Sequence, residues 1–341
     1  MTLDERKKLI LESVIRDYVE TAEPVGSRAM VKKHGFKVSA ATVRNEMSDL
    51  EDMGYLEQPH TSAGRIPSQK GFRYYVDCMM ERENLDDKET DILLHLLDDS
   101  YQELNELVQK IGHFLARITN YTSFIIVPSV RLSKFKYLQL IPIEEGRALV
   151  LLVTDLGMVM HRHIEVPDSI TASELELIGQ MFNQILAGKK IAEIQRSDLQ
   201  ELRDELKQRR KVINRALEAI ESLLEDCSEE RVIISGALNI MNEPEFKDVD
   251  KLRKILAFLE EESLLKNLIP GDIGDDIDIR IGRENKAEDI KELSLVFAGY
   301  RTLGEPGKMG LMGPVRMEYW KAAGSLDSVR EIIEEIIKKR F

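Results

Sequence analysis

The sequence lacks the features that mark several large classes of protein. It has no run of about 18 apolar residues, so a membrane-spanning helix is not expected, and its charged start, Met1–Arg6, has no apolar signal region. The two cysteines, Cys78 and Cys227, lie far apart and neither belongs to a CxxC pair. This usage predicts reduced thiols and argues against a disulfide or a zinc site. We therefore expect a cytoplasmic protein that does not contact a membrane.

Signatures of enzymes and of cofactor sites are also missing. The chain contains no P-loop, GxGxxG, GxSxG or HExxH motif. His161 and His163 share one face of an expected strand, but no third metal ligand accompanies them. The glycine-rich stretch Gly304–Gly313 predicts a mobile hairpin in preference to a phosphate-binding loop. We expect no enzymatic activity, no cofactor and no metal.

Negative charge is abundant but unevenly distributed. The formal net charge is −13, yet the first 82 residues carry 13 Lys and Arg against 13 Asp and Glu. Residues 25–76 are locally basic, with 8 bases and 5 acids. All of the excess acid therefore lies beyond residue 82, where it would repel DNA. This distribution favours a modular protein with one nucleic-acid-binding end.

The N-terminal region has the pattern of a small DNA-binding domain. Helical periodicity and capping residues predict helices at 3–21, 27–35, 40–53 and 69–81. Two short strand candidates, 55–58 and 65–67, flank a turn-forming segment between the last two helices. Three short helices followed by a two-stranded hairpin are typical of a winged helix-turn-helix, which we place at 1–83.

The rest of the chain predicts an α+β, multidomain protein. A long helix is expected at 88–119, and four apolar runs that predict one antiparallel sheet follow at 123–127, 137–143, 148–154 and 159–166. Helical pattern then begins at the capping box Thr171–Glu174. Later strands are expected at 231–235, 277–281, 294–300 and 315–319, among helices near 248–264 and 326–339. An interrupted sheet indicates an insertion, so we expect one domain from 88–166 and 229–341, with an inserted, mostly helical domain at 167–228.

An apolar seam runs along the expected insertion. Its members recur at heptad spacing: Leu199, Leu202, Leu206, Ile213, Ile220 and Leu223. Such an a/d pattern is typical of helices packed as a coiled coil. Periodicity does not distinguish a helix packed within one subunit from a dimerisation helix, and both interpretations stay open at this point.

The helix expected at 40–53 has two faces of opposite character. At 100° per residue, Val43, Met47 and Leu50 fall on one face, which must be buried. The opposite face carries the DNA-reading candidates Ala41, Arg44, Asn45 and Ser48, with Ser39 as the N-cap and Thr42 at the flank. Arginine can grip guanine, and asparagine adenine, through two hydrogen bonds each. The alternative is a solvated polar face, but the surrounding helices and hairpin favour a recognition helix.

Further candidates for DNA contact lie in the hairpin and around it. Arg65 would follow the phosphates or enter the minor groove, and Gly64 would supply a tight turn. The other hairpin candidates are polar: His60, Thr61 and Ser62. Candidates for non-specific phosphate contact are basic: Lys32, Lys33, Lys70 and Arg73. Each of these residues is also compatible with an ordinary solvated surface.

Several short stretches stand out together along the chain. They are Pro24–Ser27, Ser39–Met47, Leu50–Glu51, Gly54–Leu56, Pro59–Pro67, Gly71–Asp77, Ile281–Asn285 and Gly313–Tyr319. As a set they resemble the HrcA repressors of bacterial heat-shock genes. The most specific stretch is PHTSAGRIP at 59–67, and the resemblance spans almost the whole chain.

The resemblance implies a fold and a function beyond what spacing indicates. It implies a GAF-like domain that carries an inserted dimerising domain, and a homodimer that binds the inverted repeat called CIRCE in double-stranded DNA. It also implies repression of chaperone operons, with activity modulated by a GroEL-type chaperonin. Because GAF-like folds often hold small molecules, the alternative is a metabolite-responsive regulator that uses this domain as a ligand sensor.

Overall fold

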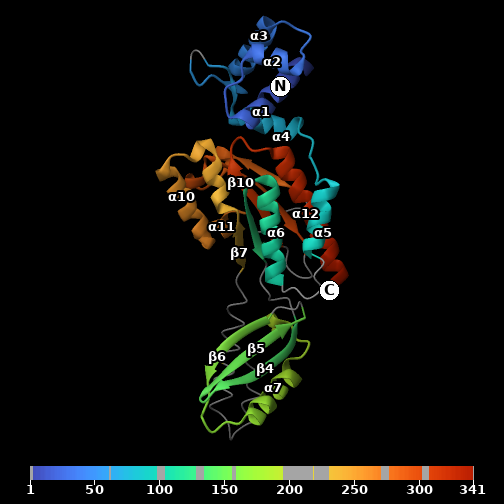
Figure 1. The fold of residues 1–341 in the computed structure, drawn as a ribbon, viewed down its shortest axis with the longest axis vertical. Coiled ribbons are helices and arrows are strands. Elements are labelled where there is room, and N and C mark those ends of the chain that lie inside the picture. The colour runs from blue at the N-terminus through green and yellow to red at the C-terminus, as the bar shows by residue number, and fades with distance from the viewer. Residues whose placement is uncertain are drawn as a thin grey trace.

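The computed structural model describes residues 3–60, 63–97, 104–127, 134–155, 159–194, 230–269, 276–301 and 307–340, together with Glu218. These residues form a mixed α+β structure. Three parts follow one another along its long axis: a helical N-terminal unit, a central unit around a five-stranded sheet, and a distal unit around a three-stranded sheet (Figure 1). Among the described residues, no helix is long and apolar enough to span a membrane.

The N-terminal unit consists of four helices and a short hairpin. Its elements are α1 (Glu5–Thr21), α2 (Ser27–His34), α3 (Ala40–Asp52), β1 (Leu56–Glu57), β2 (Ile66–Pro67) and α4 (Gln69–Cys78). Side chains of Asp4, Ser39 and Ser68 cap α1, α3 and α4 by accepting a hydrogen bond from a backbone N–H three residues ahead. These elements confirm the helices and strands predicted here, although α4 ends three residues earlier than expected.

The central unit is built on an antiparallel sheet of five strands. Its helices are α5 (Asp87–Leu97), α6 (Leu104–Thr119), α10 (Val249–Glu260), α11 (Glu262–Leu268) and α12 (Tyr319–Arg340), with short 3-10 turns η3 (Ala237–Asn242), η4 (Pro244–Phe246), η5 (Gly282–Glu284) and η6 (Glu288–Ile290). The strands are β3 (Thr122–Val127), β7 (Arg231–Ser235), β8 (Asp278–Ile281), β9 (Leu293–Tyr300) and β10 (Gly307–Pro314). Their spatial order is β7-β3-β10-β9-β8.

Helices cover both faces of this sheet. In β3, Ile125 and Val127 belong to a core shared with α6 and α12, whereas Phe124 and Ile126 belong to a second core with α10 and α11. Every residue of β3 is consequently buried. A strand buried on both faces reads as a continuous apolar run, which is the pattern seen at 123–127.

The distal unit has a smaller sheet with one covered face. It contains β4 (Phe135–Glu144), β5 (Arg147–Thr154), β6 (Val159–Glu165), α7 (Ala172–Leu186) and the short η2 (Ile191–Glu193). Side chains that alternate along β4, β5 and β6 pack with α7 into a core that contains no residue of the other two units. The capping box of Thr171 and Glu174 at the start of α7 is confirmed.

The expectation of one antiparallel sheet from the four apolar runs is wrong. The run at 123–127 pairs with β7 and β10 in the central sheet, and only the later three runs pair with one another. The expected single helix at 88–119 is also wrong as a straight element, because α5 and α6 contact each other. Local periodicity predicts the type of an element, but pairing partners far away in the chain decide its place.

The strand expected at 315–319 is wrong as well. Strand β10 ends at Pro314, before this segment, and α12 begins at Tyr319. Glycine is depleted in strands, and the stretch Gly304–Gly313 therefore predicts a mobile hairpin, whereas Gly307–Pro314 forms strand β10, paired with β3 and β9. In the structure, a Cβ at Gly310 would collide with the ring of Phe124 on β3. These glycines therefore allow aromatic rings to lie directly on the backbone of a central, buried strand.

Candidate nucleic-acid interface

Helix α3 presents the two faces that its sequence predicts. Val43, Met47 and Leu50 are buried in the core of the N-terminal unit. Ala41, Arg44, Asn45 and Ser48 are exposed, and Thr42 is half-buried at the flank. Among the described residues, neither Arg44 nor Asn45 has a side-chain hydrogen bond or ion pair. Both donors are therefore available to an outside partner.

The N-terminus of α3 is held by Ser39. Its hydroxyl accepts a hydrogen bond from the backbone N–H of Thr42 at 3.1 Å and lies 3.0 Å from the Thr42 hydroxyl. These contacts occupy Ser39 within the helix cap. They orient the first turn, which carries Arg44 and Asn45 toward the outside.

Acidic residues on the flank of α3 are neutralised by α1. The Lys7 ammonium lies 2.6 Å from a carboxylate oxygen of Glu46 and 3.0 Å from one of Asp49. The hydrogen bonds that Lys7 donates to Glu46 and Asp49 raise the pKa of Lys7 above its usual range. This pairing lowers the repulsion that two carboxylates beside the exposed face would exert on a phosphate backbone.

The hairpin packs closely against the chain that precedes α2. Arg65 and Val25 form an antiparallel bridge, with a 2.9 Å hydrogen bond in each direction. A Cβ at Gly64 would collide with the carbonyl of Val25, and the φ of Gly64 is not in the left-handed region. Gly64 is thus required for close approach, and not for the tight turn that the sequence suggested. His60 is exposed, whereas Thr61 and Ser62 lie outside the described residues.

Arg65 links the hairpin to α3. Its guanidinium lies 2.6 Å from a carboxylate oxygen of Glu51, and its side chain is 19% exposed. Its Nε is buried and has no hydrogen-bond partner in the described structure. Contact between Arg65 and DNA stays a prediction, and it would require a group able to compete with Glu51.

The basic candidates differ in their surroundings. Lys32 is exposed. The Lys33 ammonium lies 2.8 Å from Asp17 and 2.6 Å from Glu20, and the hydrogen bonds that it donates to these carboxylates raise its pKa. Lys70 donates to the carbonyl of Met53 at 2.7 Å and lies over the ring of Tyr55. Lys32 is therefore the candidate with the fewest competing partners.

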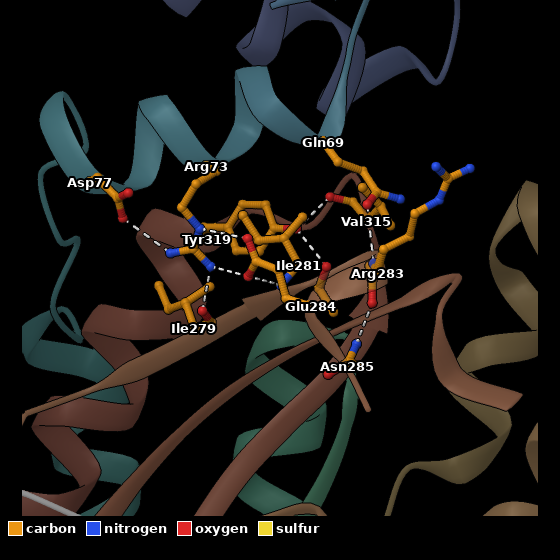
Figure 2. Close-up of polar contacts among 12 residues, drawn as sticks. Gln69, Arg73, Asp77, Ile279, Ile281, Arg283, Glu284, Asn285, Val315 and Tyr319 are labelled. Carbon is orange, nitrogen blue, oxygen red and sulfur yellow. Dashed lines mark hydrogen bonds and ion pairs between the residues drawn. The ribbon is translucent and has the colours of Figure 1, made fainter. Parts of the chain in front are cut away.

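Arg73 faces the central unit. Its guanidinium donates to both carboxylate oxygens of Glu284, to Asp77 and to the carbonyl of Ile279 (Figure 2). This placement commits all of its nitrogens to the protein and argues against a phosphate contact in this conformation. No local sequence pattern indicates this contact, because Glu284 lies 211 residues further along the chain.

One set of candidate residues is not described by the structure. The seam residues Leu199, Leu202, Leu206, Ile213, Ile220 and Leu223 lie outside the described residues. Sequence reasoning also missed Lys7 and Glu51, which support α3 from behind. The sequence does contain one indication of their role. The helix expected to approach DNA carries four acidic residues, and acidic residues close to DNA need basic partners.

The comparisons with known proteins cover the full chain. A family model described as the HrcA protein C terminal domain matches residues 105–323. A heat-inducible transcription repressor HrcA of Pelotomaculum thermopropionicum is 40% identical, over 99% of this chain and 98% of that relative. One from Ruminiclostridium cellulolyticum is 41% identical, over 99% of both chains. A crystal structure of a hypothetical protein superposes with a TM-score of 0.69, at 25% identity and with full coverage of both chains.

These matches place the protein in the class of transcription repressors. No enzyme is among the relatives named above. The chain belongs to the HrcA family of heat-inducible transcription repressors.

Proposed function

We propose that this protein is a sequence-specific repressor of heat-shock chaperone operons, which binds the inverted CIRCE repeat as a homodimer in the cytoplasm. The observation that carries the proposal is the exposed face of α3, where Arg44 and Asn45 have no partner among the described residues. The N-terminal unit then acts as a winged helix-turn-helix, with α3 in the major groove and the β1–β2 hairpin as the wing.

The remaining domains are proposed from the topology and the family. The central unit, 88–127 and 230–341, serves as the GAF-like domain. The insertion is placed at 134–229, because β4, β5 and β6 share a core with α7 and not with the central sheet. This replaces the boundary of 167 expected from the sequence. A dimer built on the insertion would place two copies of α3 on two half-sites, which matches a palindromic operator.

Operator binding is tested with Arg44→Ala. We expect a loss of about 1–3 kcal/mol in operator binding and a weaker preference for operator over scrambled DNA, because a two-pronged base contact disappears. Lys32→Ala is the matched control, since loss of a phosphate contact weakens binding to both duplexes alike and reduces the salt dependence. Titrations of both duplexes across a salt series measure these effects. Unchanged discrimination by Arg44→Ala would refute the recognition face.

Dimerisation is tested with Leu206→Asp. A charge in the heptad seam should split the dimer and weaken operator binding, because the two half-sites are then bound independently. Light scattering measures the mass. An unchanged dimer mass would place this helix inside one subunit.

Regulation is the last part of the proposal. A GroEL-type chaperonin would support the active repressor, and unfolded client proteins would compete for it, so adding purified chaperonin should increase operator binding. The metabolite-sensing alternative gains no support from the cavity of about 230 Å³ between β4 and α7, because that cavity lies in the distal unit. A metabolite screen against operator affinity tests that alternative.

A further inference from the structure

Arginine side chains cross the boundary between the N-terminal and central units at separate places, two of which lie at α4 and just before α12. Arg82 also pairs with Asp327 of α12. At the first place, Arg73 of α4 donates from Nε to Glu284 at 2.9 Å and from Nη2 to the other oxygen of the same carboxylate (Figure 2). Close by, the backbone N–H of Arg283 donates to the Gln69 side chain at 3.1 Å. A planar guanidinium held by both oxygens of one carboxylate fixes orientation as well as distance.

The second place lies just before α12. Arg316 donates from Nη1 to the carbonyl of Val19 near the end of α1, at 3.0 Å. Its other two nitrogens each lie 2.5 Å from a carboxylate oxygen, one of Glu243 and one of Glu245. Arg316 is thus held by the central unit on one side while it caps the carbonyl end of α1 on the other.

Aromatic rings also pack across this boundary. Phe72 packs edge-on against Tyr319 with ring centroids 5.8 Å apart, and Tyr75 packs against Trp320 at 6.0 Å. All four side chains belong to one core that continues from the N-terminal unit into the central unit. Contacts at separated points around a shared core resist rotation of one unit on the other.

We propose that Arg73 with Glu284, and Arg316 with Glu243 and Glu245, are positioning residues that set the orientation of α3 on the central unit and thereby select the spacing of the two operator half-sites. The proposal rests on the dimeric operator binding proposed above. Half-sites lie on one face of DNA only at separations near whole helical turns. A repressor with rigidly held recognition helices accepts one separation, whereas loosely held helices accept several.

The test separates this role from a phosphate contact by Arg73. Glu284→Arg breaks the pair without touching a residue assigned to DNA, and Arg73→Glu with Glu284→Arg restores it in reverse. The matched control reverses an exposed pair inside the central unit, Lys251 with Glu292, whose atoms lie 2.8 Å apart. Each full-length variant is titrated with inverted repeats of the native spacer and of a spacer longer by about 5 base pairs, half a helical turn.

Wild type should prefer the native spacer. In Glu284→Arg this preference should fall about tenfold, and in the double exchange and the surface control it should return to that of wild type. An unchanged preference in Glu284→Arg would overturn the proposal. If Arg73 instead contacts phosphate, Glu284→Arg should leave the spacer preference unchanged and strengthen binding to both repeats, because it frees Arg73 and adds a positive charge, whereas the double exchange, which removes Arg73, should weaken binding to both.

A second readout does not need DNA. Trp320 is the single tryptophan of the chain and lies at this boundary, 8% exposed, with the Arg16 guanidinium over its ring. Glu284→Arg should shift its emission to longer wavelength and increase its quenching by acrylamide, with recovery in the double exchange. If wild type shows no operator preference, the proposed function fails while this signal still tests the positioning contacts; unchanged fluorescence in Glu284→Arg would overturn them.

Discussion

The N-terminal unit and the distal unit are joined to the central unit in different ways. Core residues of the N-terminal unit and of one face of the central sheet form a single cluster, reinforced by Arg73 and Arg316. The distal unit has a core of its own, drawn only from the segment between Phe135 and Ile194. In the described structure, the first junction is a packed interface and the second is not.

This difference indicates how each unit responds to change. Units that share a core lose stability together, because a cavity in either affects the same packed side chains. A unit with a separate core unfolds by its own equilibrium. We therefore expect that changes in the core of the central unit alter the packing of the N-terminal unit, and that changes in the distal core leave the packing within the N-terminal unit unaltered.

The largest expected effect comes from removing an aromatic ring in each core. Phe72→Ala should destabilise the protein by about 3–5 kcal/mol, because Phe72 is 1% exposed and its ring contacts Tyr319 across the boundary. Phe182→Ala, in a fully buried position of α7, should have a similar cost confined to the distal unit. Hydrogen exchange by mass spectrometry measures where protection is lost.

The two variants should give complementary maps. Phe72→Ala should weaken protection in both α1 and β9, whereas Phe182→Ala should weaken it only in β4, β5, β6 and α7. Loss of protection restricted to the N-terminal unit in Phe72→Ala would mean that the shared core does not couple the two units.

An intermediate effect is expected at Arg316. Arg316→Ala leaves Glu243 and Glu245 without their partner at a site where the arginine side chain is 13% exposed, which should cost about 3 kcal/mol. Arg253→Ala removes a pair on the exposed face of α10 and should cost about 0–1 kcal/mol. Urea denaturation of both variants measures the difference, and equal losses would contradict the interpretation of Arg316 as a boundary contact.

The cost of Arg316→Ala should depend on pH. Burial raises the pKa of Glu243, and Arg316 opposes this shift, so the variant raises that pKa further. A carboxyl whose pKa is higher in the folded than in the unfolded protein binds more protons when folded, so stability rises as the pH falls through this window. The loss should therefore be largest at neutral pH and smaller in acid, and a loss that grows in acid would contradict it.

The smallest effect comes from helix caps, one in each region. Ser39→Ala removes the cap of α3, and Thr171→Ala removes the capping box of α7; each should cost about 1 kcal/mol. Calorimetry should show the first change in the transition shared by the N-terminal and central units and the second in a separate transition. If both variants lower the temperature of one common unfolding transition, the distal unit unfolds together with the N-terminal and central units.

Much of the local structure could be predicted from the sequence. The N-terminal helices were predictable because the caps Ser39 and Ser68 and the apolar periodicity act within a few residues of one another, whereas the cap Asp4 was not predicted. The same holds for the capping box at Thr171. Strand β10 was not predictable, because its glycines are explained only by rings that pack on it, of Tyr300 on the adjacent strand and of Tyr121 and Phe124 from a distant part of the chain.

The candidate site divides in the same way. The exposed positions of Arg44 and Asn45 followed from helical periodicity alone, since Val43, Met47 and Leu50 must face the core. The partners of Arg65 and Arg73 did not follow. A basic side chain near a DNA-reading helix has the same sequence signature whether it faces phosphate or a carboxylate of its own chain, and only the structure brings Glu51 and Glu284 to them.

The sequence by itself determined the class of fold, the elements of the N-terminal unit, the two faces of α3 and the family. These features depend on contacts between residues that are close in the sequence, so the spacing of apolar, polar and capping side chains predicts them. Only the tertiary structure decided that β3 pairs in the central sheet and not with β4, β5 and β6, and that the distal unit has its own core. It also decided that Arg73 of the N-terminal unit binds Glu284 of the central unit. Such choices depend on contacts between distant segments, for example between Val19 and Arg316, which are 297 residues apart, and local periodicity carries no information about them.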